Sequence, residues 1–354
     1  MPRPNLKPIA EQVVVVTGAT SGIGLATARL AAERGAAVFL ISRNADALKR
    51  LTDEFRAKGG RADHAVADVG EEVQLRAAAA KCDAVFGGFD TWVNNAGVSI
   101  FGRIEDTPLE DQRRLFDTNY WGVVHGSRLA VERLRARPGG GALINLGSIL
   151  SDFPVPVQGI YSASKHAVKG FTNALRQELF VDAPQVSVTL IKPAAIDTPY
   201  KEHARNYMGA PGTNPPPVYA TPLVAEAIVY AAETPTREIT VGGGGKLQAL
   251  FGVWFPRLSE AISARIIPPL LKDKAANHPA DSDALYAPGR DLRERAPYPM
   301  VREVSWYSRA QQNPQTTAAA IGGGLALLWI WSSARRALRH RHIRHEAVRR
   351  YLED

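Results

Sequence analysis

The chain has 354 residues, of which 45% are hydrophobic, enough to form a large buried core in one domain or two. Its single cysteine, Cys82, excludes an internal disulfide and a zinc site built from cysteines. About half of the net charge of +8 comes from residues 335–354, which hold seven arginines, so the near-neutral remainder gives no indication of nucleic-acid binding.

Short apolar stretches alternate with longer amphipathic stretches through the first two thirds of the chain. The short stretches predict seven strands, at Val13–Val16, Ala37–Ile41, Ala65–Ala67, Thr91–Val93, Ala142–Leu146, Val186–Ile191 and Glu238–Val241. The longer stretches predict helices over 23–34, 45–57, 109–117, 119–136 and 161–181. This alternation predicts an α/β fold with a doubly wound, parallel, Rossmann-type sheet that helices cover on both faces.

The pattern changes after the Gly242–Gly245 run. Residues 246–271 are apolar with a helical pattern, which we expect to break at Pro256 and to end at Pro268-Pro269. Residues 272–315 are polar and rich in proline and arginine, as is typical of irregular structure. We therefore predict a domain over 1–245, a helical and irregular C-terminal extension over 246–315, and an apolar segment with a basic tail over 316–354.

A glycine-rich sequence, Thr17 to Gly24, joins the first predicted strand to the first helix. Gly18 allows a tight turn, Gly22 lets the backbone approach a pyrophosphate, and Gly24 lets helix and strand pack closely. The N-terminal N–H groups of the helix favour bound phosphate. A simple glycine-rich turn is the alternative, but the flanking strand and helix favour a dinucleotide site formed by Gly18, Thr20, Ser21, Gly22, Ile23 and Gly24.

Several further motifs follow in chain order. They are Asp68-Val69, Asn94-Asn95-Ala96-Gly97, Asn119-Tyr120-Trp121-Gly122, and the set Ser148, Tyr161 and Lys165. With the glycine-rich loop, these motifs make residues 10–245 resemble the short-chain dehydrogenase/reductase family. The resemblance implies an oxidoreductase that moves a hydride between a nicotinamide cofactor and a carbonyl or alcohol.

The resemblance also implies which residues contact the cofactor. Asp68 is expected at the adenine, and the other expected contacts are Val69, Asn95, Ala96, Gly97, Tyr161, Lys165, Pro193, Ile196 and Thr198. The chain departs from the family pattern at Pro193-Ala194, where the family has Pro-Gly. The added methyl group puts the shape of this loop in question.

The expected catalytic set is Asn119, Ser148, Tyr161 and Lys165. Tyr161 and Lys165 stand four apart on a predicted helix, so both lie on one face. An ammonium near the phenol would lower the tyrosine pKa from its usual value of about 10, and Tyr161 would then exchange a proton with substrate. Ser148 would donate a hydrogen bond to the substrate oxygen. By resemblance, Asn119 holds a water that links Lys165 to solvent.

The choice of cofactor depends on Ser42-Arg43-Asn44, after the second predicted strand. NAD-preferring folds place an acid here for the ribose 2′-hydroxyl, whereas a nearby arginine accommodates the 2′-phosphate of NADP. Neither Ser42 nor Arg43 is acidic, so Arg43 predicts NADP(H), with a surface arginine that caps a loop as the alternative.

The substrate is expected to be a small, apolar molecule. Most residues between Ser148 and Tyr161 are apolar, namely Ile149, Leu150, Phe153, Val155 and Val157, and they line a pocket or pack beneath a loop. Gln158, Tyr200 and His203 are further candidates for substrate contact. Two other functions stay open: a catalytically silent nucleotide-binding or scaffold protein, and an epimerase or dehydratase on the same fold.

The sequence also bears on location and assembly. Met1–Glu11 has no long apolar run and the resemblance implies a homo-oligomer, so we expect a cytoplasmic protein that self-associates. Residues 316–334 are 19 uncharged residues, about 28 Å as a helix against a hydrocarbon core of about 30 Å. A span with the arginines inside would place the catalytic domain outside.

We therefore expect the tail to lie on a membrane surface as a basic amphipathic helix. Its apolar positions at a helical spacing are Ala334, Ala337, Leu338, Val348, Tyr351 and Leu352. A tail packed on its own domain, a disordered tail and a true span are the alternatives. His340, His342 and His345 lie among arginines, which favours a solvated basic face over a metal site.

Overall fold

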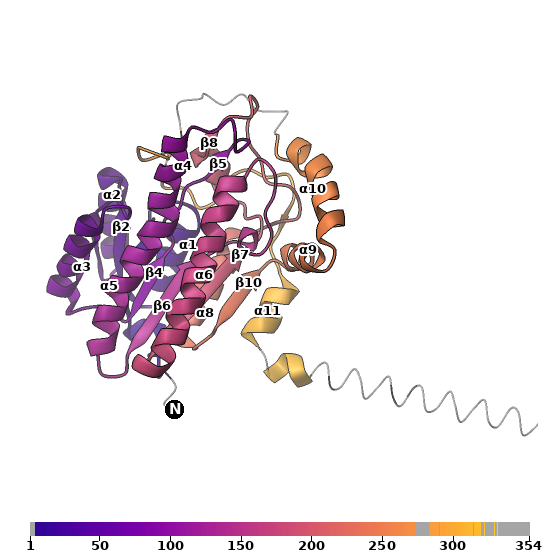
Figure 1. Ribbon diagram of the computed structural model, residues 1–354. Coiled ribbons are helices and arrows are strands. Elements are labelled where there is room, and N and C mark those ends of the chain that lie inside the picture. Colours follow the sequence, from indigo (N-terminus) through magenta and orange to yellow (C-terminus); the bar gives the residue numbers. More distant parts are fainter. Residues whose placement is uncertain are drawn as a thin grey trace, which may run out of the picture. The chain divides into compact units, whose positions relative to one another are not determined.

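The computed structural model describes residues 4–272, 283–289, 291–313 and 315–319, with single residues 322, 329 and 331. The chain divides into two units, Met1–Ser308 and Arg309–Asp354, and the fold below is that of the first. Its centre is a seven-stranded parallel sheet between two layers of helices (Figure 1). The predicted doubly wound α/β fold is therefore confirmed.

The strand order is β10-β7-β6-β4-β1-β2-β3. The strands are β1 (Val13–Thr17), β2 (Ala37–Ser42), β3 (Ala62–Val66), β4 (Thr91–Asn94), β6 (Gly141–Leu146), β7 (Val186–Pro193) and β10 (Glu238–Val241). The chain moves outward from β1 to β3 and then returns to place β4 on the other side of β1. Ligands of open α/β sheets bind at the carboxyl ends of the strands where the order reverses in this way.

Alternation along the strands divides the core into two layers. Val14 and Val16 face one layer, with α1 (Gly22–Glu33), α2 (Ala45–Ala57) and α8 (Thr221–Glu233). Val13 and Val15 face the other, with α3 (Glu72–Phe86), α5 (Gly122–Ala136) and α6 (Gly159–Asp182). Every residue of β1 is buried, which explains why this strand reads as a continuous apolar run.

Shorter elements lie mostly around the carboxyl edge of the sheet. They are η1 (Ile9–Glu11), β5 (Ile100–Phe101), α4 (Leu109–Phe116), η2 (Asp117–Trp121), η3 (Ile149–Ser151), α7 (Tyr200–His203), β8 (Arg205–Asn206), β9 (Val218–Tyr219), β11 (Val301–Arg302) and α11 (Trp306–Gln312). The polar region after residue 272 thus contains a strand and a helix as well as irregular chain.

Four details differ from the sequence predictions. The third strand begins earlier, at Ala62, and neither α3 nor α8 was predicted. The buried side of α3 is Leu75, Ala78, Ala79 and Cys82, whose three small side chains give only a weak periodic signal. The predicted break at Pro256 is confirmed, but α10 (Pro256–Leu270) continues through Pro268 and Pro269, because the Leu271 N–H still bonds the Ile267 carbonyl at 3.0 Å.

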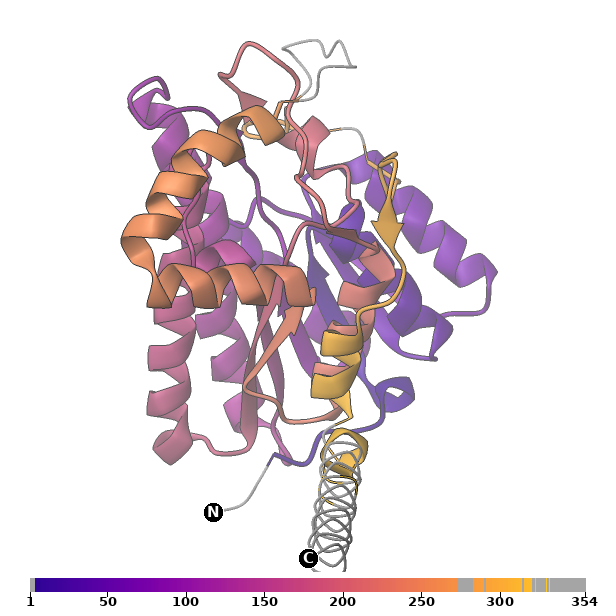
Figure 2. The same ribbon diagram turned by 90° about the vertical axis from the view of Figure 1, so that its right-hand side faces the viewer.

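The helices α9 (Gly243–Trp254) and α10 form a pair at the side of the unit that Figure 2 turns toward the viewer, drawn in orange. Most of the predicted apolar segment and basic tail, including the six apolar tail positions and the three histidines, lies outside the described residues. Within the described part of the chain, no helix is both long enough and apolar enough to cross a bilayer.

Candidate active site

The glycine-rich loop has the close contacts that its glycines allow. Gly18 has a φ of +66°, and a Cβ there would lie 2.9 Å from the Cα of Ala96. A Cβ on Gly24 would lie 2.1 Å from the Gly18 carbonyl oxygen, so only glycine lets α1 start this close to the loop. The Asn95 Nδ2 donates to the carbonyls of Thr17 at 2.9 Å and Gly18 at 3.2 Å. Gly24 and Asn95 therefore shape the loop.

A first cavity, the cofactor cavity, lies at the carboxyl ends of β1, β2 and β4. Eight of the seventeen predicted cofactor residues line it, namely Gly18, Thr20, Ser21, Arg43, Asp68, Val69, Ala96 and Gly97. Its remaining walls include His203, which the sequence placed among substrate contacts, and a distant segment represented by Ala284, Pro288, Gly289 and Asp291.

Asp68 is held by two arginines on one side of this cavity. Its Oδ2 pairs with Arg114 and lies 3.9 Å from the Arg43 Nη1, and its Oδ1 accepts the Gly70 N–H at 3.0 Å. Burial acts to raise the pKa of Asp68, but these bonds and positive charges outweigh it and hold the pKa below its ordinary value. Asp68 is therefore a fixed anion beside Arg43.

Residues 283–289 and 291–296, which we call the clasp, cross the cofactor cavity. The Leu292 N–H donates to the Thr20 carbonyl at 2.8 Å, and the Gly22 N–H donates to the Arg293 carbonyl at 2.9 Å. The Arg43 Nη2 donates to the Ala284 carbonyl at 2.5 Å. The clasp thus bonds both the glycine-rich loop and the residue that predicts cofactor choice.

The clasp is anchored at both ends. On one side Arg295 pairs with the buried Asp197 of the loop after β7, and Arg29 pairs with Glu294 at 2.7 Å. On the other side the Tyr286 hydroxyl donates to Asp111 Oδ1 at 2.7 Å. Leu292 has a φ of +69°, which is uncommon for a residue other than glycine. These anchors hold the backbone in a conformation that the leucine does not itself favour.

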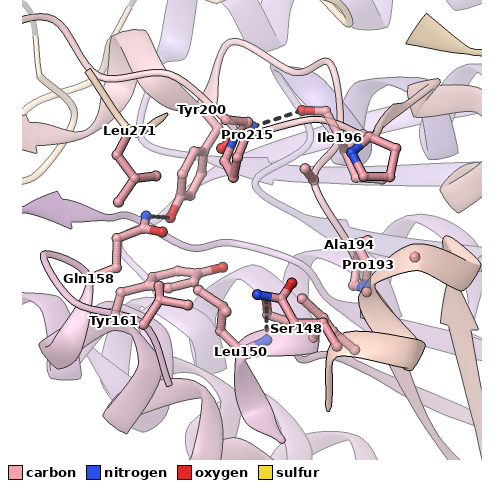
Figure 3. A pocket seen from close by; sticks show the side chains of 18 of the residues that line it. Ser148, Leu150, Gln158, Tyr161, Pro193, Ala194, Ile196, Tyr200, Pro215 and Leu271 are labelled. Atoms are coloured by element: carbon pink, nitrogen blue, oxygen red, sulfur yellow. Dashed lines mark hydrogen bonds between the residues drawn. The ribbon is translucent and has the colours of Figure 1, made fainter. Parts of the chain in front are cut away.

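A second cavity, the substrate cavity, contains the reactive hydroxyl groups. Ser148 follows β6, Tyr161 projects from the first turn of α6, and both side chains line the cavity (Figure 3). The Ser148 Oγ accepts the Leu150 N–H at 3.1 Å and so caps η3. Ser148 also forms a hydrogen bond with Tyr161, so the two hydroxyl groups lie side by side in the cavity.

The other walls of the substrate cavity are mostly apolar. They include Ile23, Ile149, Leu150, Val155, Pro193, Ala194, Ile196, Thr198, Pro215, Ile267 and Leu271. Of the apolar loop predicted to line a pocket or to pack beneath a loop, Phe153 and Val157 do not line this cavity and pack in the buried cluster that also contains Ile149 and Val155. Ser21 lines the cofactor cavity and Ile23 lines the substrate cavity, so the glycine-rich loop borders both.

Tyr200 and Gln158 form a polar group at one wall, as Figure 3 shows. The Gln158 Nε2 donates to the Tyr200 hydroxyl at 2.9 Å, and that hydroxyl donates to the Ser99 Oγ at 2.5 Å. The Tyr200 ring meets the Tyr161 ring edge-on, with 5.6 Å between the centroids. Two of the three residues proposed from the sequence as substrate contacts, Gln158 and Tyr200, thus share this cavity with Tyr161.

Lys165 lies beneath Tyr161 and is buried. Its Nζ is 5.7 Å from the centre of the Tyr161 ring and donates to the Leu146 carbonyl at 2.9 Å. Burial lowers the pKa of Lys165 to about 8. Burial raises the pKa of Tyr161 to about 12, although hydrogen bonding with Ser148 and Tyr200 acts to lower it. The expected lowering of the tyrosine pKa by the ammonium is therefore wrong here, because desolvation dominates.

Asn119 lies in the π-helical turn η2, an irregularity that is frequent at functional sites. Its Nδ2 donates to the Val98 carbonyl at 2.9 Å and the Ser164 Oγ at 3.1 Å, and its Oδ1 accepts the Val98 N–H at 2.8 Å. A Cβ on Gly97 would lie 3.3 Å from this oxygen and 3.7 Å from the Lys165 Nζ. Asn119 is thus close to Lys165, and its water-holding role stays a prediction.

Ala194, which departs from the family pattern, fits without a left-handed backbone. Its N–H bonds the Val241 carbonyl at 2.8 Å, and Ala194 is not among the described non-glycine residues with positive φ. A Cβ on Gly242 would lie 2.8 Å from the Ala194 Cβ, and one on Gly245 would lie 3.0 Å away. Glycines after β10 therefore make room for the methyl group.

Comparison with known proteins identifies the family. The family model described as short chain dehydrogenase matches residues 12–208. The chain belongs to this family. It is 43% identical to the oxidoreductase YxnA of Bacillus subtilis over 334 residues, 94% of this chain and 93% of that protein. It is 31% identical to the oxidoreductase SadH of Mycobacterium tuberculosis over 271 residues, 73% of this chain and 97% of that protein.

Solved structures of the family show the same fold. A short-chain dehydrogenase/reductase from Burkholderia phymatum in complex with NAD is 25% identical, with a TM-score of 0.65 over 72% of this chain and 97% of that one. A gluconate 5-dehydrogenase from Burkholderia cenocepacia in complex with NADP and tartrate is 26% identical, with a TM-score of 0.58 over 67% and 96%. This protein is accordingly an oxidoreductase of the short-chain dehydrogenase type, and nicotinamide cofactors of both kinds occur among its structural neighbours.

Three features of the family site in this chain have no signal in the sequence. Arg114 reaches Asp68 across 46 residues, and the clasp returns to the glycine-rich loop from more than 260 residues away. Asn214 and the following prolines also line the substrate cavity. Each depends on long-range packing, and no spacing rule links these residues to the motifs that they contact.

Proposed function

We propose that this protein uses NADP(H) to interconvert an apolar carbonyl compound and its alcohol. The observation that supports this most directly is the presence of Ser148 and Tyr161 in one cavity with mostly apolar walls. A carbonyl oxygen in this cavity could accept a hydrogen bond from Ser148 and a proton from Tyr161. The apolar walls suit the rest of an apolar substrate.

The glycine-rich loop fits a dinucleotide, because the close approaches at Gly18 and Gly24 leave backbone N–H groups at the start of α1 beside the cofactor cavity. When bound, a nicotinamide cofactor supplies or accepts the hydride. Ser148 then fixes the substrate oxygen, Tyr161 gives or takes the proton, and the Lys165 ammonium stabilises the phenolate. At neutral pH the high pKa of Tyr161 keeps the phenol protonated, which favours proton donation to a carbonyl.

Preference for NADP(H) rests on Arg43, which lines the cofactor cavity at the end of β2 where no acid stands. Its guanidinium is shared with the Ala284 carbonyl and lies near Asp68, but it still presents positive charge to the cavity. We expect NADPH to be used at least about tenfold more efficiently than NADH. Arg43→Ala should weaken NADPH binding much more than NADH binding, and equal use of both cofactors by the wild type would refute the preference.

The substrate class is tested with a panel of aliphatic, steroid and aromatic ketones and alcohols, assayed with NADPH and NADP⁺. Turnover of apolar members and little turnover of polyols would support the proposal. Binding of NADPH without turnover of any member would favour the alternative, a catalytically silent nucleotide-binding or scaffold protein.

We also propose a functional division into a dinucleotide-binding catalytic domain over 1–245, an extension over 246–315, and a tail over 316–354. In this proposal the protein is cytoplasmic and homo-oligomeric, and its tail holds it at a membrane surface. The full chain should then sediment partly with membranes and be released by high salt, while a chain cut after Asn313 stays in solution with its activity. Full-length protein that stays in solution at low salt would contradict this role of the tail.

A further inference from the structure

Helix α10 has its apolar side turned outward. Ser259 and Ser263 are on its buried side, while an aliphatic row at four-residue spacing is exposed to solvent. That row consists of Leu258, Ile262, Ile266 and Leu270, with exposed fractions of 53%, 40%, 49% and 44%. A surface helix of a soluble domain normally has the opposite arrangement, so this row is suited to an apolar partner.

Helix α9 extends the same exposed character. Trp254 and Phe255 stand at the junction of the two helices and are 75% and 57% exposed. Large residues of α9 that are also exposed are Leu247, Leu250 and Val253. Together with the aliphatic row of α10, these residues form what we call the docking face. So many adjacent exposed apolar side chains are rare on a monomeric protein and mark an interaction site.

The charges that α9, α10 and the adjoining residues themselves carry are almost all positive. Over residues 243–272 the basic residues are Lys246, Arg257, Arg265 and Lys272, against a single acid, Glu260. An apolar face with Trp, Phe and Leu that is flanked by Lys and Arg matches the composition of helices that lie in the interface of an anionic bilayer.

We propose that the docking face of α9 and α10 binds the surface of an anionic lipid bilayer. Two copies that paired through this face by a twofold axis would bring the same cations together, so the charge pattern disfavours self-association. A bilayer with anionic headgroups instead complements both the apolar residues and the cations. The partner is therefore a lipid surface.

The inner sides of the same helices form part of the substrate cavity. Gln248 of α9, Ile267 of α10 and the adjoining Leu271, which Figure 3 labels, line it, whereas the residues of the docking face are exposed to solvent. A bilayer bound there would lie against helices that form a wall of the substrate cavity. An apolar substrate dissolved in the bilayer would then have a short path to Tyr161.

This inference goes beyond the proposed function, because it concerns residues that neither bind cofactor nor belong to the tail. The test uses full-length protein and vesicles of phosphatidylcholine with about one third phosphatidylglycerol. One variant combines Leu258→Ser, Ile262→Ser and Ile266→Ser. The matched control combines Val73→Ser, Phe180→Ser and Val181→Ser, which replace side chains that are 81%, 63% and 73% exposed on α3 and α6.

We expect the docking-face variant to lose at least about tenfold in vesicle binding and the control to bind like wild type. Turnover of a water-soluble ketone by both variants, or their thermal unfolding if no ketone is turned over, verifies the fold. Fluorescence quenching by brominated lipid should also fall in Trp254→Phe but not in Trp121→Phe. The proposal is overturned if the docking-face variant binds vesicles like wild type, which would assign binding to the tail. It is also overturned if the only effect of the three substitutions is to dissociate an oligomer.

Discussion

The catalytic core and the clasp bound the same cofactor cavity but are specified in different ways. In the core, functional residues either follow a buried parallel strand, as Ser148 follows β6 and Asn95 follows β4, or lie on a regular helix, as Tyr161 does on α6. The described residues of the clasp, 283–289 and 291–296, form no helix or strand, and the clasp makes backbone bonds to Thr20 and Gly22. We therefore expect residues of the core to act on the reacting atoms directly. The clasp can affect the reaction only through the glycine-rich loop and Arg43, to which it is bonded.

This difference predicts which kinetic constants change when residues of each region are substituted. Substitutions at the ends of β6 or in α6 should lower kcat, because they remove groups that act on the reacting atoms. Substitutions in the clasp should change the KM for the cofactor and leave kcat nearly unchanged. The predictions below test this division, beginning with the largest effect.

Tyr161→Phe should have the largest effect. The substitution removes the hydroxyl that exchanges the proton and keeps the ring against Tyr200. We expect kcat to fall by at least about a hundredfold, the usual range for loss of a general acid, while the dissociation constant of NADPH changes little. Steady-state kinetics and cofactor titration measure the two effects. Activity within tenfold of wild type would remove Tyr161 from its assigned role.

The pH dependence of carbonyl reduction should show the environment of Lys165. The pKa of Lys165 is lowered to about 8 and that of Tyr161 is raised to about 12, in both cases by burial. In the proposed mechanism the Lys165 ammonium stabilises the phenolate, and this ammonium is present below pH 8 and lost above it. We expect kcat/KM to be level below about pH 8 and to fall about tenfold per unit above. In Lys165→Arg the fall in kcat/KM should begin at a higher pH. A fall that begins at the same pH as in the wild type would contradict the assignment of the fall to Lys165.

The core could be predicted from the sequence because its signals are local. A buried parallel strand reads as an apolar run, and the residue after it faces the carboxyl edge, so the strand ends indicated which side chains would meet. Ser148, Tyr161 and Lys165 lie close together, as the resemblance to the family and the four-residue spacing of Tyr161 and Lys165 on a helix implied. The environment of Tyr161 was not predictable in the same way, because its pKa depends on burial, which a four-residue spacing does not reveal.

The clasp could not be predicted because its contacts are non-local and use the backbone. Leu292 reaches Thr20 through its N–H, which every residue other than proline has, and its positive φ is not encoded by a glycine. Arg114 is similar, since one arginine among many on a helix gives no indication that it reaches Asp68. Such residues become functional candidates only once the tertiary structure places them.

The clasp can be tested at Leu292 with a matched pair of variants. Leu292→Pro removes the N–H that bonds Thr20 and cannot adopt the φ of +69°, whereas Leu292→Gly keeps the N–H and adopts it freely. We expect the KM for NADPH to rise about tenfold in the proline variant, with kcat within about threefold. The glycine variant should stay within about threefold of wild type in both. Equal cofactor KM values in the two variants would show that the clasp does not support the cofactor loop.

The smallest expected effect concerns Asp291 of the clasp, which accepts a hydrogen bond from Asn44 Nδ2 at 2.8 Å and lines the cofactor cavity with Arg43. Its carboxylate opposes binding of a 2′-phosphate beside Arg43. Asp291→Asn removes that charge with little change in shape, so we expect NADPH to bind about threefold more tightly and NADH to be unaffected. Glu303→Gln is the matched control. It removes the negative charge of Glu303, which pairs with Arg295 of the clasp, and should change the affinity for neither NADPH nor NADH. Because only NADPH carries the 2′-phosphate, a gain for both cofactors would point to a general loosening of the clasp. A gain confined to NADPH would instead show that the clasp, although it supplies no reacting group, adjusts the cofactor preference of the core through the charge it places near Arg43.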